Sequence, residues 1–185
     1  MQPFSSHDVG VTNVVASKTV VGQGFCLRIE AGILNYEICD ETFTVDALAN
    51  TITIAAQTAI LIKRNSVTIT FAWNTTGFVK GNYTISAHAW PVPGETYTSD
   101  NNFTDGWVVV SMVGDLTGGT PNPWDFVPDG KVAGIDVSVV SRCFGSSPET
   151  QLPLIWSANC DVNNNGKVDG TDVAIVSRHF GEAEP

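Results

Sequence analysis

Two copies of one motif near the C-terminus limit the possible folds of this chain more strongly than any other feature. Eleven residues between Gly130 and Gly145 are identical to those 36 positions later (166 − 130 = 36), and both copies read GKVxGxDVxxVSRxFG. Each copy carries one short helical pattern, and a single helix cannot bury its own apolar stripe. We therefore expect two loop–helix units whose helices pack on each other.

The second copy contains the oxygen spacing of an EF-hand-type calcium loop. Residues 161–172, DVNNNGKVDGTD, place oxygen-bearing side chains at loop positions 1, 3, 5, 9 and 12 and a glycine at position 6. Calcium takes about six to eight oxygens, so a tight loop must offer them from alternate residues around a sharp turn. A plain Asn/Asp/Gly turn would not require this register before a helix. The predicted ligands are Asp161, Asn163, Asn165, the carbonyl of Lys167, Asp169 through a water, and Asp172.

The loop of the first copy admits two alignments. In one, Asp115 takes the place of Asp161, and residues 119–128 are inserted before the match resumes. In the ungapped alternative, Asp125 stands at position 1 and Val127, which has no side-chain oxygen, at position 3. We favour the inserted alignment; a first loop that keeps its fold without a metal is a further alternative. The ligands predicted for this first site are Asp115, Thr117, Asp129, the carbonyl of Lys131 and Asp136, with Ala133 at position 9.

With its two calcium loop–helix repeats, the segment from about residue 114 to 181 resembles a dockerin in the variant found in archaeal surface proteins. The resemblance implies two Ca²⁺ sites, the second more firmly than the first. It also implies a protein partner, a cohesin-like domain.

The part before the repeats reads as short strands separated by turn residues. Period-two alternation of apolar and polar residues is clearest in VTITFAW and YTISAHAW. The expected strands cover residues 9–15, 25–33, 43–49, 51–55, 59–62, 66–73, 83–90 and 107–113. Their number and spacing predict an all-β immunoglobulin-like sandwich over residues 1–113, followed by a small α domain with the two EF-hand-like repeats over residues 114–185.

The sandwich region resembles the CARDB domain, a cell-adhesion-related module of archaeal and bacterial surface proteins. The resemblance covers about residues 7–113 and rests on the WNTTG turn, the GNYTISA strand and the DNN turn before the last strand. It implies an extracellular, cell-surface address and a spacer or adhesive role.

The four cysteines fall two in each predicted domain. None has the CxxC spacing of a zinc site. Four buried free thiols are one interpretation. Two disulfides, Cys143 with Cys160 and Cys26 with Cys39, are the other, and the first would join the two repeats.

Three sequons, at Asn74, Asn82 and Asn102, permit N-glycosylation at expected strand edges and turns. Trp73, Trp90 and Trp107 are expected in the core of the sandwich or at its edge. Trp124, in the proline-rich insertion PNPWDFVP, is expected either to pack on the helices or to face a partner.

Net charge and motifs exclude several classes of function. A net charge of -10 argues against binding to nucleic acid and to anionic membranes. No apolar run is long enough for a transmembrane helix, and the N-terminus lacks the form of a signal peptide. No GxSxG, phosphate-binding glycine loop or HExxH motif is present, so we do not expect an enzyme.

Three functions remain open. In the first, which we favour, the chain is an extracellular structural or adhesion protein that forms filaments, with other copies of itself as partners. The contact would be head-to-tail or through a donated strand. In the second, it is a binding module that docks a cohesin-like domain on a scaffold or cell wall. In the third, it is a carbohydrate-binding or hydrolytic part of such an assembly.

Overall fold

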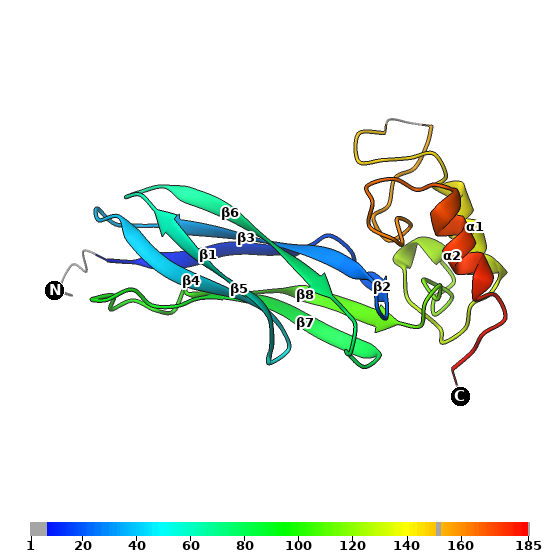
Figure 1. Cartoon of the computed structure of the whole chain (residues 1–185), viewed down its shortest axis with the longest axis horizontal. Helices are drawn as coiled ribbons and strands as arrows, with labels where there is room; N and C mark the ends of the chain where they lie inside the picture. The colour runs from blue at the N-terminus through cyan, green and yellow to red at the C-terminus, as the bar shows by residue number, and fades with distance from the viewer. Residues whose placement is uncertain (1–6, 151–152, 185) are drawn as a thin grey trace. The chain divides into compact units, whose positions relative to one another are not determined.

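The computed structural model describes residues 7–150 and 153–184, which form a β-sandwich and a small domain with two helices (Figure 1). This is the coarse fold class that the sequence predicted. The described residues divide into two compact units, and the division does not fall at a single point in the chain. The first comprises residues 7–17, 28–73 and 83–107, and the second comprises 18–27, 74–82, 108–150 and 153–184.

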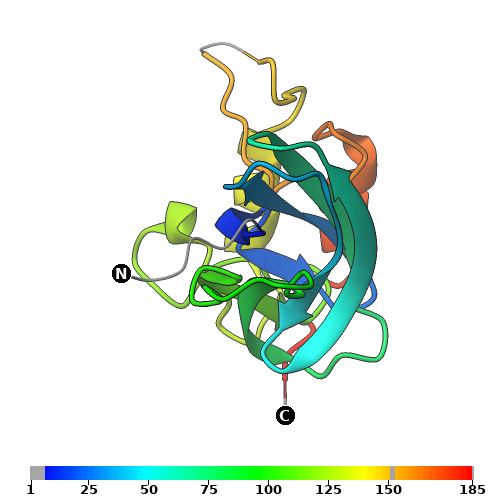
Figure 2. The same ribbon diagram turned by 90° about the vertical axis from the view of Figure 1, so that its left-hand side faces the viewer.

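Eight strands build the sandwich in two sheets. The strands are β1 Val9–Ala16, β2 Val20–Gly22, β3 Cys26–Asn35, β4 Glu41–Ala49, β5 Ile52–Leu61, β6 Ser66–Asn74, β7 Gly81–Ala89 and β8 Asn102–Ser111. One sheet has the order β1-β3-β6, and the other has the order β2-β8-β7-β4-β5. Figure 2 shows the strands nearly end-on, as two curved layers.

Alternation along the strands places one set of side chains in the core. In β4, buried residues alternate with more exposed ones from Glu41 to Ala49. Trp73 is fully buried and meets Tyr83 edge to face, with ring centroids 5.6 Å apart. Trp90 and Trp107, in contrast, are 54% and 66% exposed, so Trp73 alone of the three predicted tryptophans belongs to the core.

The strand pattern differs from the prediction at three places. The segments 51–55 and 59–62 are one continuous strand, β5, which pairs with β4 from Ile52 to Leu61. Gln57 and Thr58, between the two segments, do not break a strand as glycine or proline does. Strand β2 was not predicted, because three residues carry too little periodicity. Strand β8 begins at Asn102 rather than at residue 107.

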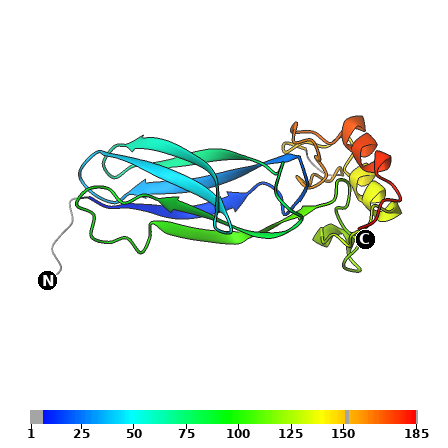
Figure 3. The same ribbon diagram turned by 60° about the horizontal axis from the view of Figure 1, so that its bottom comes forward.

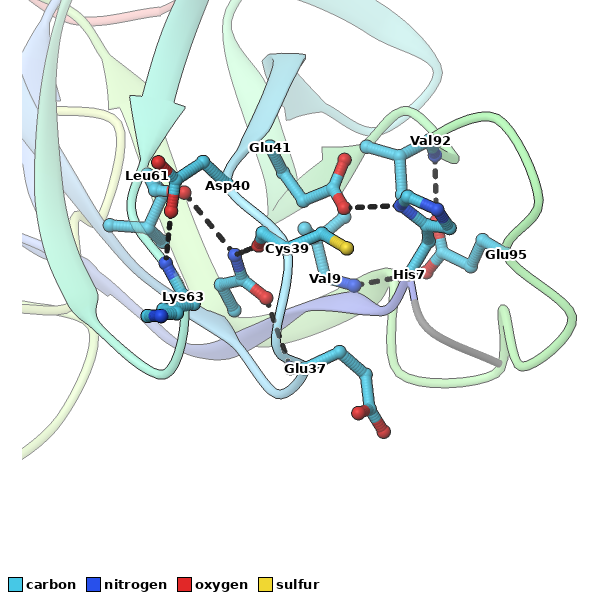
Figure 4. Close-up of polar contacts among 11 residues, drawn as sticks. His7, Val9, Glu37, Cys39, Asp40, Glu41, Leu61, Lys63, Val92 and Glu95 are labelled. Carbon is cyan, nitrogen blue, oxygen red and sulfur yellow. Dashed lines mark hydrogen bonds and ion pairs between the residues drawn. The ribbon is translucent and has the colours of Figure 1, made fainter. Parts of the chain in front are cut away.

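Polar side chains tie together the strand ends near residue 7 (Figure 4). The carboxylate of Glu95 accepts the backbone N–H of Val92 at 2.7 Å and that of Val9 at 3.2 Å. Nδ1 of His7 lies 2.6 Å from Glu41. The loop around Glu95 is therefore held against the start of β1.

The small domain contains two α-helices, α1 Gly134–Arg142 and α2 Gly170–Arg178, and a 3-10 turn, η1 Pro123–Asp125. The helices lie side by side (Figures 1 and 3), as the repeat predicted. Their core contains Val139, Val140 and Val176 together with the two buried cysteines, Cys143 and Cys160. Among the described residues, no helix is long and apolar enough to span a membrane.

Candidate metal sites

The second loop is closed by carboxylates that accept backbone N–H groups. Asp161 accepts from Asn165 at 3.0 Å and from Gly166 at 2.8 Å. Asp172, at the start of α2, accepts from the N–H of Asn163 at 3.2 Å. The predicted first and last ligands therefore lie at the base of the loop, where their hydrogen bonds bring the two ends of the loop together.

The first loop repeats these hydrogen bonds in spite of its insertion. Asp115 accepts from Asp129 at 3.2 Å and from Gly130 at 2.9 Å. Asp136, at the start of α1, accepts from the N–H of Thr117 at 3.0 Å. Asp115 thus makes the bonds of Asp161, and Asp136 makes those of Asp172. This is the arrangement of the inserted alignment.

Asp125 does not take the first position that the ungapped alignment gave it. Its carboxylate accepts from Thr120 at 3.0 Å and from the side-chain amide of Asn122 at 2.7 Å. These bonds stay within the insertion. The hydroxyl of Thr117 donates to the carbonyl of Pro123 at 2.8 Å, which leaves lone pairs of its oxygen for a cation.

At position 9 the two loops differ. Asp169 caps α2 by accepting the N–H of Thr171 at 2.7 Å, and this hydrogen bond lowers the pKa of Asp169. The first loop has Ala133 at the same place, with no oxygen in its side chain. Both helices have a second capping bond. Asp172 accepts the N–H of Asp169 at 2.9 Å, and Asp136 accepts the N–H of Ala133 at the same distance.

The chemistry of these loops fits a hard cation. Asp115, Asp136, Asp161 and Asp172 are between 0% and 3% exposed, and burial of carboxylates is costly unless they are paired or bind a metal. Burial raises the pKa of Asp115 to about 7, with Asp136 and Asp129 adding repulsion. Burial likewise raises the pKa of Asp172.

The lysines of the loops do not neutralise these carboxylates, because the side chains of Lys131 and Lys167 are exposed. Calcium would be held by the buried carboxylates together with the side chains of Asn163, Asn165 and Thr117 and the carbonyls of the two lysines. No group of three or more His, Cys, Asp or Glu side chains gathers into a metal cluster within residues 7–150 and 153–184.

The two copies also join each other after the loops. Val132 exchanges backbone hydrogen bonds of 2.8 and 2.9 Å with residues 181 and 182, at the end of the second copy. Val168 exchanges bonds of the same lengths with residues 145 and 146, at the end of the first. Each loop is therefore anchored by the other copy.

The insertion packs on α1. The guanidinium of Arg142 lies 5.6 Å from the centre of the Trp124 ring, and Trp124 meets Phe126 edge to face. A small cavity beside the ring is lined by Ile135 and Val139 of α1. Of the two roles open for Trp124, the structure shows packing on the helix.

Two residues of the second unit make contacts at or next to the second loop without having been singled out from the sequence: Lys18 bonds to the loop itself, and Asn159, just before the loop, bonds to residues 19 and 20. Nζ of Lys18, which is 3% exposed, donates to the carbonyl of Asp161. The side-chain oxygen of Asn159 accepts the N–H of Thr19 at 3.0 Å and of Val20 at 3.1 Å. A lone lysine among valines and serines gave no sequence signal for this contact.

The cysteines give one corrected prediction and one that stays open. Cys26 and Cys39 cannot form the predicted disulfide. Cys26 begins β3, a ten-residue strand about 30 Å long. The carbonyl of Cys39 accepts the side-chain amide of Asn35, at the other end of that strand, at 2.8 Å. The two cysteines therefore lie too far apart for a disulfide. Cys143 and Cys160 are buried free thiols whose sulfur atoms lie 2.9 Å apart, so their disulfide stays a prediction.

The predicted glycosylation sites all lie on the surface of the sandwich. Asn74 ends β6, Asn82 lies in β7 and Asn102 begins β8, and all three side chains are exposed. Their attachment of sugar stays a prediction.

Comparison with known proteins identifies the repeat region. Residues 123–181 match the family model of the dockerin type I domain. The match begins near the ungapped start of the first copy and leaves Asp115 and Thr117 outside, although the hydrogen bonds place both in the first loop. No curated protein matches the chain.

Solved structures similar to the chain include a CARDB domain, a domain of a cell surface protein and one enzyme. A CARDB domain from Pyrococcus furiosus, determined in complex with di-metal ions, is 22% identical over 60% of this chain and 99% of that chain, with a TM-score of 0.49. A domain described as part of a cell surface protein of Methanosarcina acetivorans is 24% identical over 56% of this chain and 91% of that chain, with a TM-score of 0.43.

The enzyme is a β-glucosidase from Erythrobacter marinus, 14% identical, with a TM-score of 0.45. The similarity covers 56% of this chain and 15% of the β-glucosidase. The resemblance to a dockerin that the repeat predicted is confirmed, and residues 123–181 are the part of the chain that matches the dockerin type I family.

Proposed function

We propose that this chain is an extracellular binding module of the cell surface whose C-terminal domain docks on a protein partner of the cohesin kind when calcium is bound. The observation that carries the proposal is the pair of loops with the same hydrogen bonds, from Asp161 and Asp172 in one and from Asp115 and Asp136 in the other. Calcium at both loops would fix the ends of α1 and α2 and so present the helices as one rigid surface. The sandwich is the part that this docking would hold at the surface, as a spacer or adhesive unit.

Two features support an extracellular role. Calcium loops of this kind fill at the millimolar calcium levels outside cells. The sequons lie on exposed positions of the sandwich. The protein partner is supported separately by the dockerin match, which implies a partner that is typically a cohesin. No catalytic step is part of this proposal.

The test is calcium-dependent binding to a panel of immobilised cohesin domains. We expect binding in millimolar calcium that is lost after chelation. Asp172→Ala should abolish it, because it removes a buried carboxylate of the second loop. Asp125→Ala is the matched control, since that carboxylate bonds only within the insertion. Failure to bind any cohesin in calcium, with both loops shown to be filled, would overturn the proposed partner.

A second candidate is calcium-dependent self-assembly into a filament, with other copies of the chain as partners. The observation in its favour is that strand β5 has a neighbour on one side only, which supplies one of the two contacts that each subunit of a filament needs. The calcium-loop domain would supply the other, calcium-dependent contact. Light scattering and electron microscopy in calcium, and again after chelation, separate the two candidates. Long assemblies that dissolve on chelation support the filament, and a chain that stays small in both conditions contradicts it.

A further inference from the structure

Strand β5 leaves one side of its backbone open. It is the last strand of the five-stranded sheet and is hydrogen-bonded to β4 alone. Outside that pairing, the described contacts give a partner to one backbone group of β5. This group is the carbonyl of Leu61, which accepts the side-chain amide of Asn35 at 3.2 Å. An open row of N–H and C=O groups is a template for another strand.

The other sheet edges are protected in ways that β5 is not. Three N–H groups of β1 are bonded outside their sheet, to the side chains of Glu95 and Asp105 and to the carbonyl of Asp100. Strand β2 has only three residues. In β6, the carbonyl of Thr70 accepts the side-chain amide of Gln57 at 2.8 Å. This contact uses the side chain of Gln57 and leaves the main chain of β5 free.

The composition of β5 lacks two of the usual barriers to pairing, charge and proline. The ten residues from Ile52 to Leu61 include no charge and no proline, although the whole chain has a net charge of -10. Ile60 is 76% exposed and Ile52 is 50% exposed. Proteins normally place charges or prolines on such an edge to prevent association.

These features favour a second copy of this chain as the occupant. Ile54 bulges between two residues paired with β4, so the regular part of the edge runs over residues 55–61. Antiparallel pairing of this segment with itself about Thr58 sets Ala56 opposite Ile60 and Thr58 opposite its copy (56 + 60 = 2 × 58). Small residues then face large ones, and no like charges meet. Thr58 lies on the outer face of the sheet, where its exposed hydroxyl is 3.4 Å from the hydroxyl of Thr44.

We propose that the edge of β5 is a self-association surface, on which a second copy adds its own β5 antiparallel about Thr58 and joins the two five-stranded sheets. Because both copies use the same patch, the contact closes at a dimer. This β5 contact is separate from the calcium-dependent docking proposed above, since none of its residues belongs to either calcium loop. The dimer is therefore expected both with calcium and after chelation.

Sedimentation equilibrium of the full chain tests the proposal, over roughly a hundredfold range of protein concentration. We expect a monomer–dimer equilibrium. Ile60→Lys should raise the dissociation constant at least about tenfold, because it places a charge at the pairing edge. Val15→Lys is the matched control: Val15 is a half-exposed aliphatic residue on an edge strand of the other sheet, so this variant should still dimerise. A monomer at every concentration, or equal effects of both variants, would refute the proposal.

A cross-link locates the contact independently. Thr58→Cys places a thiol at the two-fold axis, so mild oxidation should yield a covalent dimer. The unsubstituted chain, with the same four native cysteines, should yield none under the same conditions. A dimer in sedimentation that Thr58→Cys fails to trap would place the contact elsewhere and overturn the assignment to β5.

Discussion

Asp8 is a carboxyl group whose charge opposes folding at neutral pH. Burial, together with repulsion by Asp100, Glu95 and Glu37, raises the pKa of Asp8 from 3.8 to about 6. Since the folded state binds this proton more tightly than the unfolded state, the group stabilises the fold fully below pH 3.8, and this contribution is lost as the pH rises through 6. Asp8→Asn should therefore raise the melting temperature at neutral pH and give no gain near pH 4.

Thermal unfolding in millimolar calcium measures this effect at both pH values. Glu30→Gln, which removes an exposed carboxylate from β3, is the control and should leave the melting temperature nearly unchanged. If Asp8→Asn gained as much stability at pH 4 as at neutral pH, the titration of Asp8 would not be the cause.

Cys143 and Cys160 carry the second prediction at the scale of single residues. Their sulfur atoms are 2.9 Å apart in the buried core of the small domain. An oxidised pair would restrict the unfolded chain, by about 3 kcal/mol for a loop of this size. We expect the melting temperature to fall in reductant. Cys143→Ser should remove this dependence, and Cys26→Ser should keep it. Mass spectrometry of the oxidised chain should show one disulfide, and a chain that keeps four free thiols would contradict the prediction.

At the scale of elements, Trp124 fixes the insertion on α1. Its ring contacts Arg142 and lies beside Val139, which is 2% exposed. Trp124→Ala should cost about 1–2 kcal/mol, because it removes a cation–π contact and uncovers apolar surface. Trp107→Ala, at a position 66% exposed, should change stability by less than about 0.5 kcal/mol. Denaturant unfolding measures both, and equal losses would mean that Trp124 does not stabilise α1.

The elements also show how much of the structure could be predicted from the sequence. The repeat predicted both helices and the equivalence of Asp115 with Asp161, because the spacing of oxygens in a loop is itself a geometric requirement. It did not predict where Trp124 packs, since an insertion without periodicity carries no signal for its contacts. Strand β5 was split at Gln57 and Thr58 because the apolar run weakens there, whereas pairing with β4 keeps the strand continuous. The pairing of Cys26 with Cys39 failed because closeness in sequence says nothing about the length of the intervening strand.

At the scale of the whole molecule, calcium should divide the chain into a part that needs it and a part that does not. Four buried carboxylates lie in the two loops, whereas the sandwich core is built from apolar side chains such as Phe71, Trp73 and Ile85. Without a cation the carboxylates must stay buried next to one another, which favours opening of the loops. Each filled site adds about 4 kcal/mol when calcium is present at a thousand times its dissociation constant.

Hydrogen exchange before and after chelation measures this division. We expect faster exchange in both loops, α1 and α2, and unchanged exchange in β3, β4 and β7. Calorimetric titration should find two calcium ions for the unsubstituted chain and one each for Asp136→Asn and Asp172→Asn. If Asp136→Asn left the number of bound ions unchanged, the first loop would be a fold without a metal. If chelation accelerated exchange throughout the sandwich as well, calcium would stabilise the whole chain and not the small domain alone.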